Sequence, residues 1–278
     1  MPGTNDGSGQ FTRRLGTLLQ VSIGVGQALR LGEAVMRGTA VLVHGMWSNP
    51  ADWRWVTERL RDNDVEVLAP DLPSHRTASA GLTADAAEVR SMIASARPPV
   101  VAVGWSYGCD VIHEAAAGEP AVAHLVYIAG IPNPAPGVFP PDGSEPEDDP
   151  HILVFDDGRF VLDNDWWLNE EAGTTMPAHV LGHLREHPRR PASSATWSDP
   201  STAAAWDSIP TTMIIGRFDD LVPADRVAWA ERHFDVRILD SDHFIIFREP
   251  GFVADVVIEK LDDARRSGMT SDGSREPA

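Results

Sequence analysis

The chain has 278 residues, enough for one large α/β domain or for a core with a modest insertion. Its 41 acidic residues outweigh 23 basic ones, and the net charge of −18 argues against nucleic acid and anionic membranes as partners. The single cysteine, Cys109, excludes an intrachain disulfide, and no apolar run approaches the length of a membrane span.

The first 38 residues are predicted to be an extension, helical or disordered, ahead of the first core strand. Three interpretations stay open. Arg13-Arg14 before the mildly apolar stretch Leu15–Leu31 resembles a twin-arginine export signal, although polar residues interrupt the stretch. Synthesis could instead begin at Met36, or the segment could form an amphipathic helix docked on the domain. We expect a cytoplasmic protein and leave export open.

Short apolar runs then alternate with helix-length amphipathic runs, which is typical of a parallel sheet covered by helices on both faces. We predict a mostly parallel, doubly wound sheet of about six strands, at Ala40–His44, Val65–Ala69, Val100–Val103, His124–Ala129, Thr212–Ile215 and Val236–Leu239. Helices are predicted at about Ala51–Asn63, Thr83–Ala96, Ser106–Gly118, Ala224–His233 and Gly251–Arg265.

Between residues 133 and 206 the alternation stops. The segment opens with the proline- and acid-rich run Pro140–Pro150, a predicted flexible loop, and continues with Trp166, Trp167 and a more helical stretch at Pro177–His187. An insertion this long over a sheet is usually a functional lid. We therefore divide the chain into an N-terminal extension (1–38), a core (39–132 and 207–266), a lid or cap (133–206) and a disordered tail (267–278).

The most informative motif lies directly after the third predicted strand. Gly104-Trp105-Ser106-Tyr107-Gly108 has the pattern G-x-S-x-G, and a helix-compatible run follows it at once. Between a buried strand and a helix, this pattern is typical of a nucleophile elbow. The glycines permit a tight turn that holds Ser106 exposed, in a strained conformation and at the positive end of a helix dipole. The alternative is a glycine-flanked turn without a catalytic role.

A serine hydroxyl needs a base, and the base needs an orienting acid. His243 follows the last predicted strand, and Asp219 follows the strand before it, with Asp220 as the fallback for the acid. All three groups then converge on the carboxyl edge of the sheet, where open α/β sheets bind ligands. The other nine histidines support no metal site, and we expect neither a metal nor a cofactor.

An oxyanion needs two backbone donors aimed at it in advance. One is the amide of Tyr107, the residue after the predicted nucleophile. The second should come from the loop after the first strand, where a His-Gly turn places the amide of Met46 beside the elbow. A purely structural role for the Met46 side chain, as a filler of the core, is compatible with this use of its backbone.

These motifs together resemble the α/β-hydrolase superfamily, in particular its compact, lid-bearing, esterase-like branch, which includes plant methyl esterases, hydroxynitrile lyases and many bacterial relatives. The resemblance covers about Gly38 to Leu261 and rests on His44-Gly45-Met46-Trp47, Ala69-Pro70-Asp71-Leu72-Pro73, the G-x-S-x-G motif, Gly216-x-x-Asp219-x-x-x-Pro223 and Asp242-His243-Phe244. Relatives commonly have His and Gly where this chain has Trp105 and Cys109. The packing of the elbow and the shape of the pocket are therefore expected to differ.

The leading hypothesis is a cofactor-free, carboxylesterase-like serine hydrolase that cleaves an ester or related acyl compound through an acyl-enzyme. Its partner would be a small-molecule acyl substrate, and the protein would be a monomer or homodimer. Predicted aromatic contacts to a hydrophobic group of the substrate come from Trp47, Trp105, Trp166, Trp167 and Phe244, with core packing as the alternative for each. Two other functions stay open: a lyase, perhydrolase or cyclase in the same cavity, or a non-catalytic ligand receptor.

Overall fold

A computed structural model describes residues 36–132, 149–199 and 201–272. The predicted extension up to residue 35 and most of the predicted acidic loop lie outside the described residues. Among the helices that are described, none is both long and apolar enough to cross a membrane.

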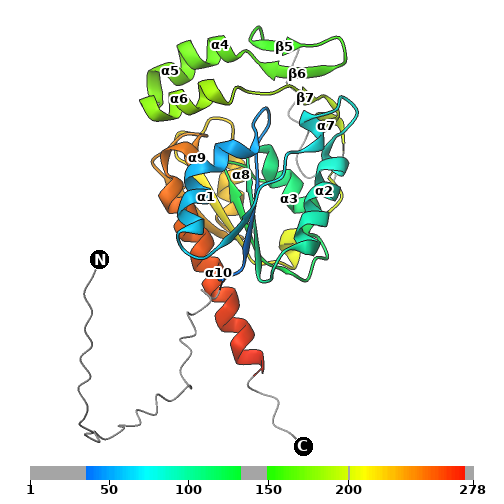
Figure 1. The fold of residues 1–278 in the computed structure, drawn as a ribbon, viewed down its shortest axis with the longest axis vertical. Helices are drawn as coiled ribbons and strands as arrows, with labels where there is room; N and C mark the ends of the chain where they lie inside the picture. Colours follow the sequence, from blue (N-terminus) through cyan, green and yellow to red (C-terminus); the bar gives the residue numbers. More distant parts are fainter. Residues whose placement is uncertain (1–35, 133–148, 200, 273–278) are drawn as a thin grey trace, which may run out of the picture. The chain divides into compact units, whose positions relative to one another are not determined.

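The centre of the fold is a six-stranded sheet in which every neighbouring pair is parallel (Figure 1). The strand order is β2-β1-β3-β4-β8-β9. Each predicted strand is found, with ends shifted by two residues at most, so the predicted parallel sheet is confirmed. The strands are β1 (Thr39–Val43), β2 (Glu66–Leu68), β3 (Val100–Trp105), β4 (Val122–Ile128), β8 (Thr211–Gly216) and β9 (Asp235–Leu239).

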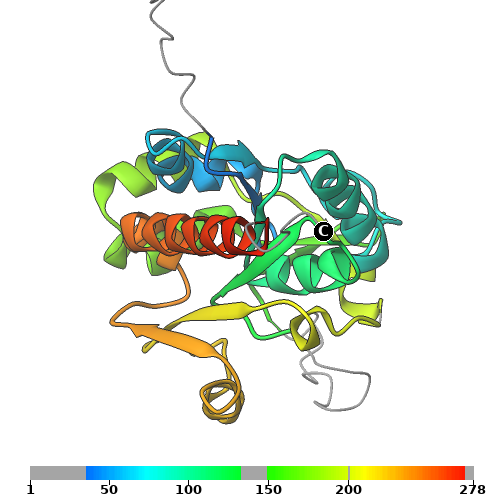
Figure 2. The ribbon, with the colours of Figure 1, turned by 90° about the horizontal axis from the view of Figure 1, so that it is seen from below.

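Helices cover both faces of this sheet, and Figure 2 shows α1 and α10 on one face and α2 and α3 on the other. Because successive strand residues point to opposite faces, the core divides in two. Along β1, Ala40 and Leu42 pack in the cluster on the α1 and α10 side, while Val41 and Val43 pack with α2 and α3. The helices are α1 (Arg54–Arg61), α2 (Leu82–Ser95), α3 (Tyr107–Ala116), α8 (Ala224–Ala230), α9 (Ile245–Arg248) and α10 (Pro250–Asp272), with short 3-10 turns η1 (Pro50–Trp53), η2 (Pro73–His75) and η5 (Ala205–Asp207).

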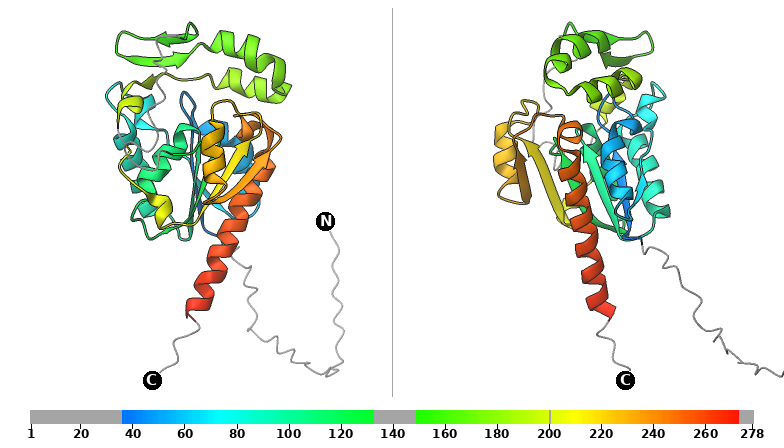
Figure 3. Two further views of the ribbon diagram at one scale, coloured as in Figure 1. Left: turned by 180° about the vertical axis from the view of Figure 1, so that it is seen from behind. Right: turned by 60° about the vertical axis from the view of Figure 1, so that its left-hand side comes forward.

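The described part of the predicted lid, from residue 149 onward, forms a layer over the carboxyl edge of the sheet (Figures 1 and 3). We call it the cap. The predicted helical stretch is present as α6, but the cap also contains a small antiparallel sheet of order β5-β6-β7 that was not predicted. Its elements are β5 (Ile152–Val154), β6 (Arg159–Leu162), α4 (Asn164–Trp166), the π-helical turn η4 (Trp167–Glu171), α5 (Ala172–Thr175), α6 (Ala178–Glu186), β7 (Ala192–Ser193) and α7 (Ala195–Ser198).

The predicted disordered tail differs from the structure in its first residues. Helix α10 continues through Asp272, and only residues 273–278 lie outside the described part of the chain. Local hydrogen bonds support this continuation, because Arg266 pairs with Asp263 one turn earlier and the Ser267 hydroxyl donates to the Asp263 carbonyl at 3.0 Å.

Candidate active site

Ser106 occupies the turn between β3 and α3, with φ 55° and ψ −125°. A residue with a side chain adopts this conformation only at a cost of about 1–3 kcal/mol, so the surroundings must hold it in place. Two backbone hydrogen bonds do so: the Ser106 amide donates to Ile128 of β4 at 2.9 Å, and the Ser106 carbonyl accepts from the Cys109 amide at 2.8 Å. The strain at the apex of the turn is therefore built into the strand-to-helix junction.

The two glycines of the motif are required by close backbone contacts. A Cβ on Gly104 would lie 2.3 Å from the carbonyl oxygen of Gly108, and a Cβ on Gly108 would lie 2.3 Å from the carbonyl oxygen of Val43 in β1. Neither position has room for a side chain. The elbow is consequently pressed against the strand that leads into the predicted oxyanion loop.

Cys109, one of the two departures from the relatives' pattern, is fully buried behind the elbow. Its thiol donates to the carbonyl oxygens of Gly104 at 3.2 Å and Ile128 at 3.5 Å. Burial raises the pKa of this thiol well above its usual value, so it stays protonated. Cys109 is therefore a packing residue of the elbow and not a second nucleophile.

The predicted base and acid are in contact at the carboxyl edge of the sheet. His243 follows β9 and Asp219 follows β8, and the His243 Nδ1 atom lies 3.0 and 3.1 Å from the two carboxylate oxygens of Asp219. The Asp219 side chain is completely buried and also accepts a hydrogen bond from the Leu221 amide at 3.0 Å. Asp220, the fallback for the acid, is exposed. The geometry thus favours Asp219 as the partner of the imidazole.

A hydrogen bond from Trp105 connects the elbow to the loop that carries His243. Its indole Nε1 donates to the His243 carbonyl at 2.9 Å, and the two rings lie 5.9 Å apart. Asp242 fixes the loop further, because its carboxylate accepts one hydrogen bond from the Phe244 amide and two from the Arg248 guanidinium. The indole at position 105 therefore fixes the backbone of the predicted base, a contact that the sequence pattern alone did not indicate.

The loop after β1 packs against the elbow. A Cβ on Gly45 would lie 3.1 Å from the Cβ of Ser106, closer than side chains normally pack, so glycine suits this close approach. Met46 comes next in the loop, and Tyr107 opens α3 directly after Ser106. The two amides predicted to hold the oxyanion thus come from the two segments that flank the Ser106 side chain. The Tyr107 hydroxyl is anchored 2.8 Å from the buried Asp85 carboxylate.

His44 and His75 lie beside this loop and are structural. Burial lowers the pKa of His44 to about 4, and its Nδ1 atom lies 2.9 Å from the Gly45 carbonyl oxygen. Burial also lowers the pKa of His75 well below its usual value, and the two rings meet edge to face. Both imidazoles are therefore neutral near pH 7 and support the loop without adding charge to it.

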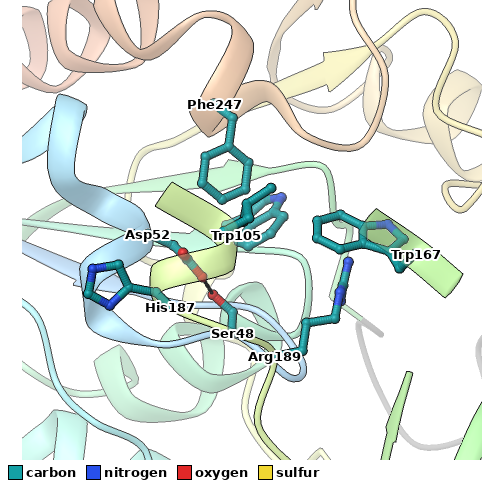
Figure 4. A pocket seen from close by; sticks show the side chains of 8 residues that line it. Ser48, Asp52, Trp105, Trp167, His187, Arg189 and Phe247 are labelled. Carbon is teal, nitrogen blue, oxygen red and sulfur yellow. Dashed lines mark hydrogen bonds between the residues drawn. The ribbon is translucent and has the colours of Figure 1, made fainter. Parts of the chain in front are cut away.

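A small pocket lies between the core and the cap (Figure 4). Trp105 stands between Phe247 of the core and Trp167 of the cap, and the guanidinium of Arg189 lies 3.8 Å from the centre of the Trp167 ring. The side chains leave a free volume of about 10 Å³, which is room for about one water molecule. Ser106 is not among the residues that line this pocket.

Two of the five aromatic residues predicted to contact substrate, Trp105 and Trp167, line this pocket. The other three are not among its lining residues. Trp166 stacks on His151 within the cap at 3.8 Å, and Trp47 meets Phe160 of β6 edge to face. Phe244 packs 5.4 Å from Trp167, beside the pocket. Substrate contacts of all five residues stay predictions.

A buried network that was not predicted joins the core to the cap. Asp52 of η1 accepts the Ser48 hydroxyl at 2.5 Å, and its other oxygen lies 3.1 Å from His183 Nε2 of α6. The side chains of Asp52 and His183 are 5% and 2% exposed. The sequence offered only an indirect signal, the Asn49-Pro50 helix start with Asp52 in its capping box, because the partner on α6 lies 131 residues away.

This fold has a strained serine after β3 and an aspartate–histidine pair after β8 and β9. Together these features define a class of protein, and comparison with known protein families identifies it. Residues 40–256 match the model of the α/β-hydrolase family, and the chain belongs to that family. A comparison with curated protein sequences finds no match.

Solved structures share this fold. A pyrethroid hydrolase from Sphingobium faniae JZ-2 is 22% identical, with a TM-score of 0.62 over 81% of this chain and 97% of that one. A methylesterase from Arabidopsis is 17% identical, with a TM-score of 0.61 over 81% and 98% of the two chains. Tomato methylketone synthase I, solved with β-ketoheptanoate, is 15% identical, with a TM-score of 0.65 over 81% and 97%. At these identities the likeness shows the fold.

Proposed function

We propose that this protein is a serine hydrolase that cleaves a carboxylic ester, or a related acyl compound with a hydrophobic group, through an acyl-enzyme. The observation that carries the proposal is the buried Asp219 carboxylate bonded to His243, at the same sheet edge as the strained Ser106. A carboxylate that fixes an imidazole as the base for a serine hydroxyl is the arrangement that activates this nucleophile.

In the proposed reaction, the Ser106 hydroxyl attacks the ester carbonyl while His243 Nε2 accepts its proton. Asp219 accepts the hydrogen bond from Nδ1, which fixes the tautomer and stabilises the imidazolium as it forms. The amides of Met46 and Tyr107 stabilise the oxyanion. The tetrahedral intermediate then collapses, the C–O bond to the alcohol breaks, and His243 gives its proton to the leaving alcohol. A water molecule repeats these steps and releases the acid.

The structural neighbours support an esterase more than another chemistry, because they include a pyrethroid hydrolase and a methylesterase. A methylketone synthase is also among them, so the fold does not by itself select hydrolysis. The acyl-enzyme separates the two classes, since a lyase or cyclase need not form one. The aromatic side chains of Trp105, Trp167 and Phe247, which line the pocket together with polar residues, support a hydrophobic substrate group.

The proposal is tested by Ser106→Ala with a panel of p-nitrophenyl esters of increasing acyl size. Loss of the nucleophile removes both covalent catalysis and base assistance, and base assistance alone is worth roughly 10²–10⁴ in rate. The matched control is Ser95→Ala at the exposed end of α2, which should leave the rate unchanged. A cleanly folded Ser106→Ala protein that keeps more than about a hundredth of the wild-type rate would refute the assignment.

A further inference from the structure

Arg190, a cap residue between α6 and β7, holds the loop that carries Met46. Its backbone amide donates to the Trp47 carbonyl at 2.8 Å, and its Nη2 atom donates to the Ser48 carbonyl at 3.3 Å. The same Nη2 atom pairs with the carboxylate of Asp71, in the loop after β2. One residue of the cap thus connects two loops of the core at the carboxyl edge of the sheet.

The segment that Arg190 holds is a strained turn. The Ser48 amide donates back to the Gly45 carbonyl at 3.3 Å, so Met46 and Trp47 form the centre of the turn. Trp47 has φ 58°, a left-handed conformation that disfavours a bulky side chain by about 1–2 kcal/mol. Such a conformation persists only where neighbouring groups fix it. The two carbonyls that Arg190 binds belong to Trp47 and to the residue that follows it.

The Arg190–Asp71 pair is suited to fix this turn at neutral pH. The two side chains are 30% and 40% exposed, so the pair is neither deeply buried nor fully screened by water. Partial burial acts to raise the pKa of Asp71, but the hydrogen bond and the positive charge of Arg190, with smaller contributions from His44 and Arg76, together outweigh burial and lower the pKa. Asp71 is therefore ionised over the working range of a serine hydrolase and keeps the guanidinium directed at the Ser48 carbonyl.

We propose that the Arg190 side chain is a positioning residue for the oxyanion hole. The backbone amide of residue 190 holds the Trp47 carbonyl whatever the side chain, and the guanidinium adds the bond to the Ser48 carbonyl and its anchor on Asp71. Through Ser48, the guanidinium fixes the end of the turn and with it the direction of the Met46 amide toward the oxyanion. The inference rests on the proposed function, because it needs Met46 to be an oxyanion donor. A donor aimed at the transition state acts on the chemical step, so loss of its support should lower kcat and leave substrate binding almost unchanged.

The test compares Arg190→Met and Arg190→Lys with Arg185→Met, a control at an exposed position on α6 that loses the same charge. With p-nitrophenyl butyrate, Arg190→Met should lower kcat about 10- to 100-fold, because a misplaced catalytic group costs up to about 10². KM should change less than about twofold. Arg190→Lys, whose single ammonium group still reaches Asp71 or Ser48, should recover part of the loss. Arg185→Met should match the wild type.

Affinity for a trifluoromethyl ketone, which forms a tetrahedral adduct on a serine nucleophile, gives a second readout. It should fall by the same factor as kcat/KM in each variant, because the adduct uses the oxyanion donors. If Arg190→Met fails to fold, Asp71→Asn replaces it in the test, because it keeps the size of the side chain. Asp71→Asn should lower kcat by a smaller factor than the one expected for Arg190→Met.

An unchanged kcat in Arg190→Met, or a loss confined to KM, would overturn the role of Arg190. So would a loss of kcat with full affinity for the ketone. Failure of the proposed function itself would look different. In that case the wild-type protein would turn over no ester, or Ser106→Ala would keep its activity.

Discussion

In the core, the side chains of the proposed triad follow the carboxyl ends of parallel strands, whereas the cap is held over that edge by side chains whose partners lie far away in the sequence. Asp219 and His243 are placed by β8 and β9, and their separation is fixed by the register of neighbouring strands. The cap has strands of only two to four residues and contacts the core through His183 and Arg190. Under the proposed function, the core therefore supplies the reacting groups, and the cap contacts the loop and the pocket beside them.

The largest effect is expected inside the core. Asp219→Asn should lower kcat by about 10⁴, because an amide at this position favours the wrong tautomer of the imidazole. Asp220→Asn is the matched control, since the neighbouring carboxylate is exposed and should matter little. Steady-state kinetics of both proteins with one activated ester checks this. If Asp220→Asn instead caused the large loss in kcat, the acid of the triad would be Asp220 and not Asp219.

The buried contact between Asp52 of the core and His183 of the cap should contribute to the free energy of unfolding. Asp52→Ala leaves the buried His183 and Ser48 side chains without their hydrogen-bond partner, and leaving a buried polar group unsatisfied typically costs about 1–3 kcal/mol. Urea unfolding measures the free energy of unfolding. Glu58→Ala removes an equal charge from an exposed i, i+4 pair with Arg54 and should cost less than about 1 kcal/mol. Equal losses for the two variants would mean that the buried pair does not hold the cap.

The cap should influence which ester is preferred. Trp167→Phe removes part of a pocket wall, roughly 40 Å² at about 25 cal/mol per Å², or about 1 kcal/mol of binding to a bulky acyl group. The kcat/KM for a benzoate ester should fall about fivefold relative to the acetate ester. Trp197→Phe, at an exposed position of the cap outside the predicted site, should leave the ratio unchanged. If both variants lost activity equally on both esters, these residues would support the cap and not the pocket.

A smaller effect is expected at an exposed position of α10, away from the site. Hydrogen bonds from Arg237 and Lys260 lower the pKa of Glu259 from 4.5 to about 2. A carboxylate with a lowered pKa adds stability above its unfolded pKa, and this contribution is lost as the pH falls from about 4.5 toward 2. The Tm difference between wild type and Glu259→Gln should be small at pH 7 and shrink further at pH 3. A difference that does not vary with pH would exclude this contribution.

The sequence was sufficient for the core because buried parallel strands are continuous apolar runs with clear ends. Once six such runs were placed, the residues after three of them met at one edge, and Ser106, Asp219 and His243 followed from topology. The cap sheet was missed because strands of four residues or fewer are too short to show a period. The bond from Trp105 to the His243 carbonyl spans 138 residues and left no local pattern to detect.

The most direct test of the central claim is to trap the acyl group on Ser106. The enzyme is mixed with p-nitrophenyl pivalate, whose hindered acyl group leaves slowly, quenched in acid within seconds and analysed by intact mass and peptide mapping. We predict one pivaloyl group per chain on the peptide that contains Ser106, a matching burst of p-nitrophenol, and neither signal in Ser106→Ala. Steady turnover with the acyl group on another residue, or a burst that survives Ser106→Ala, would contradict the assignment of Ser106 as the nucleophile.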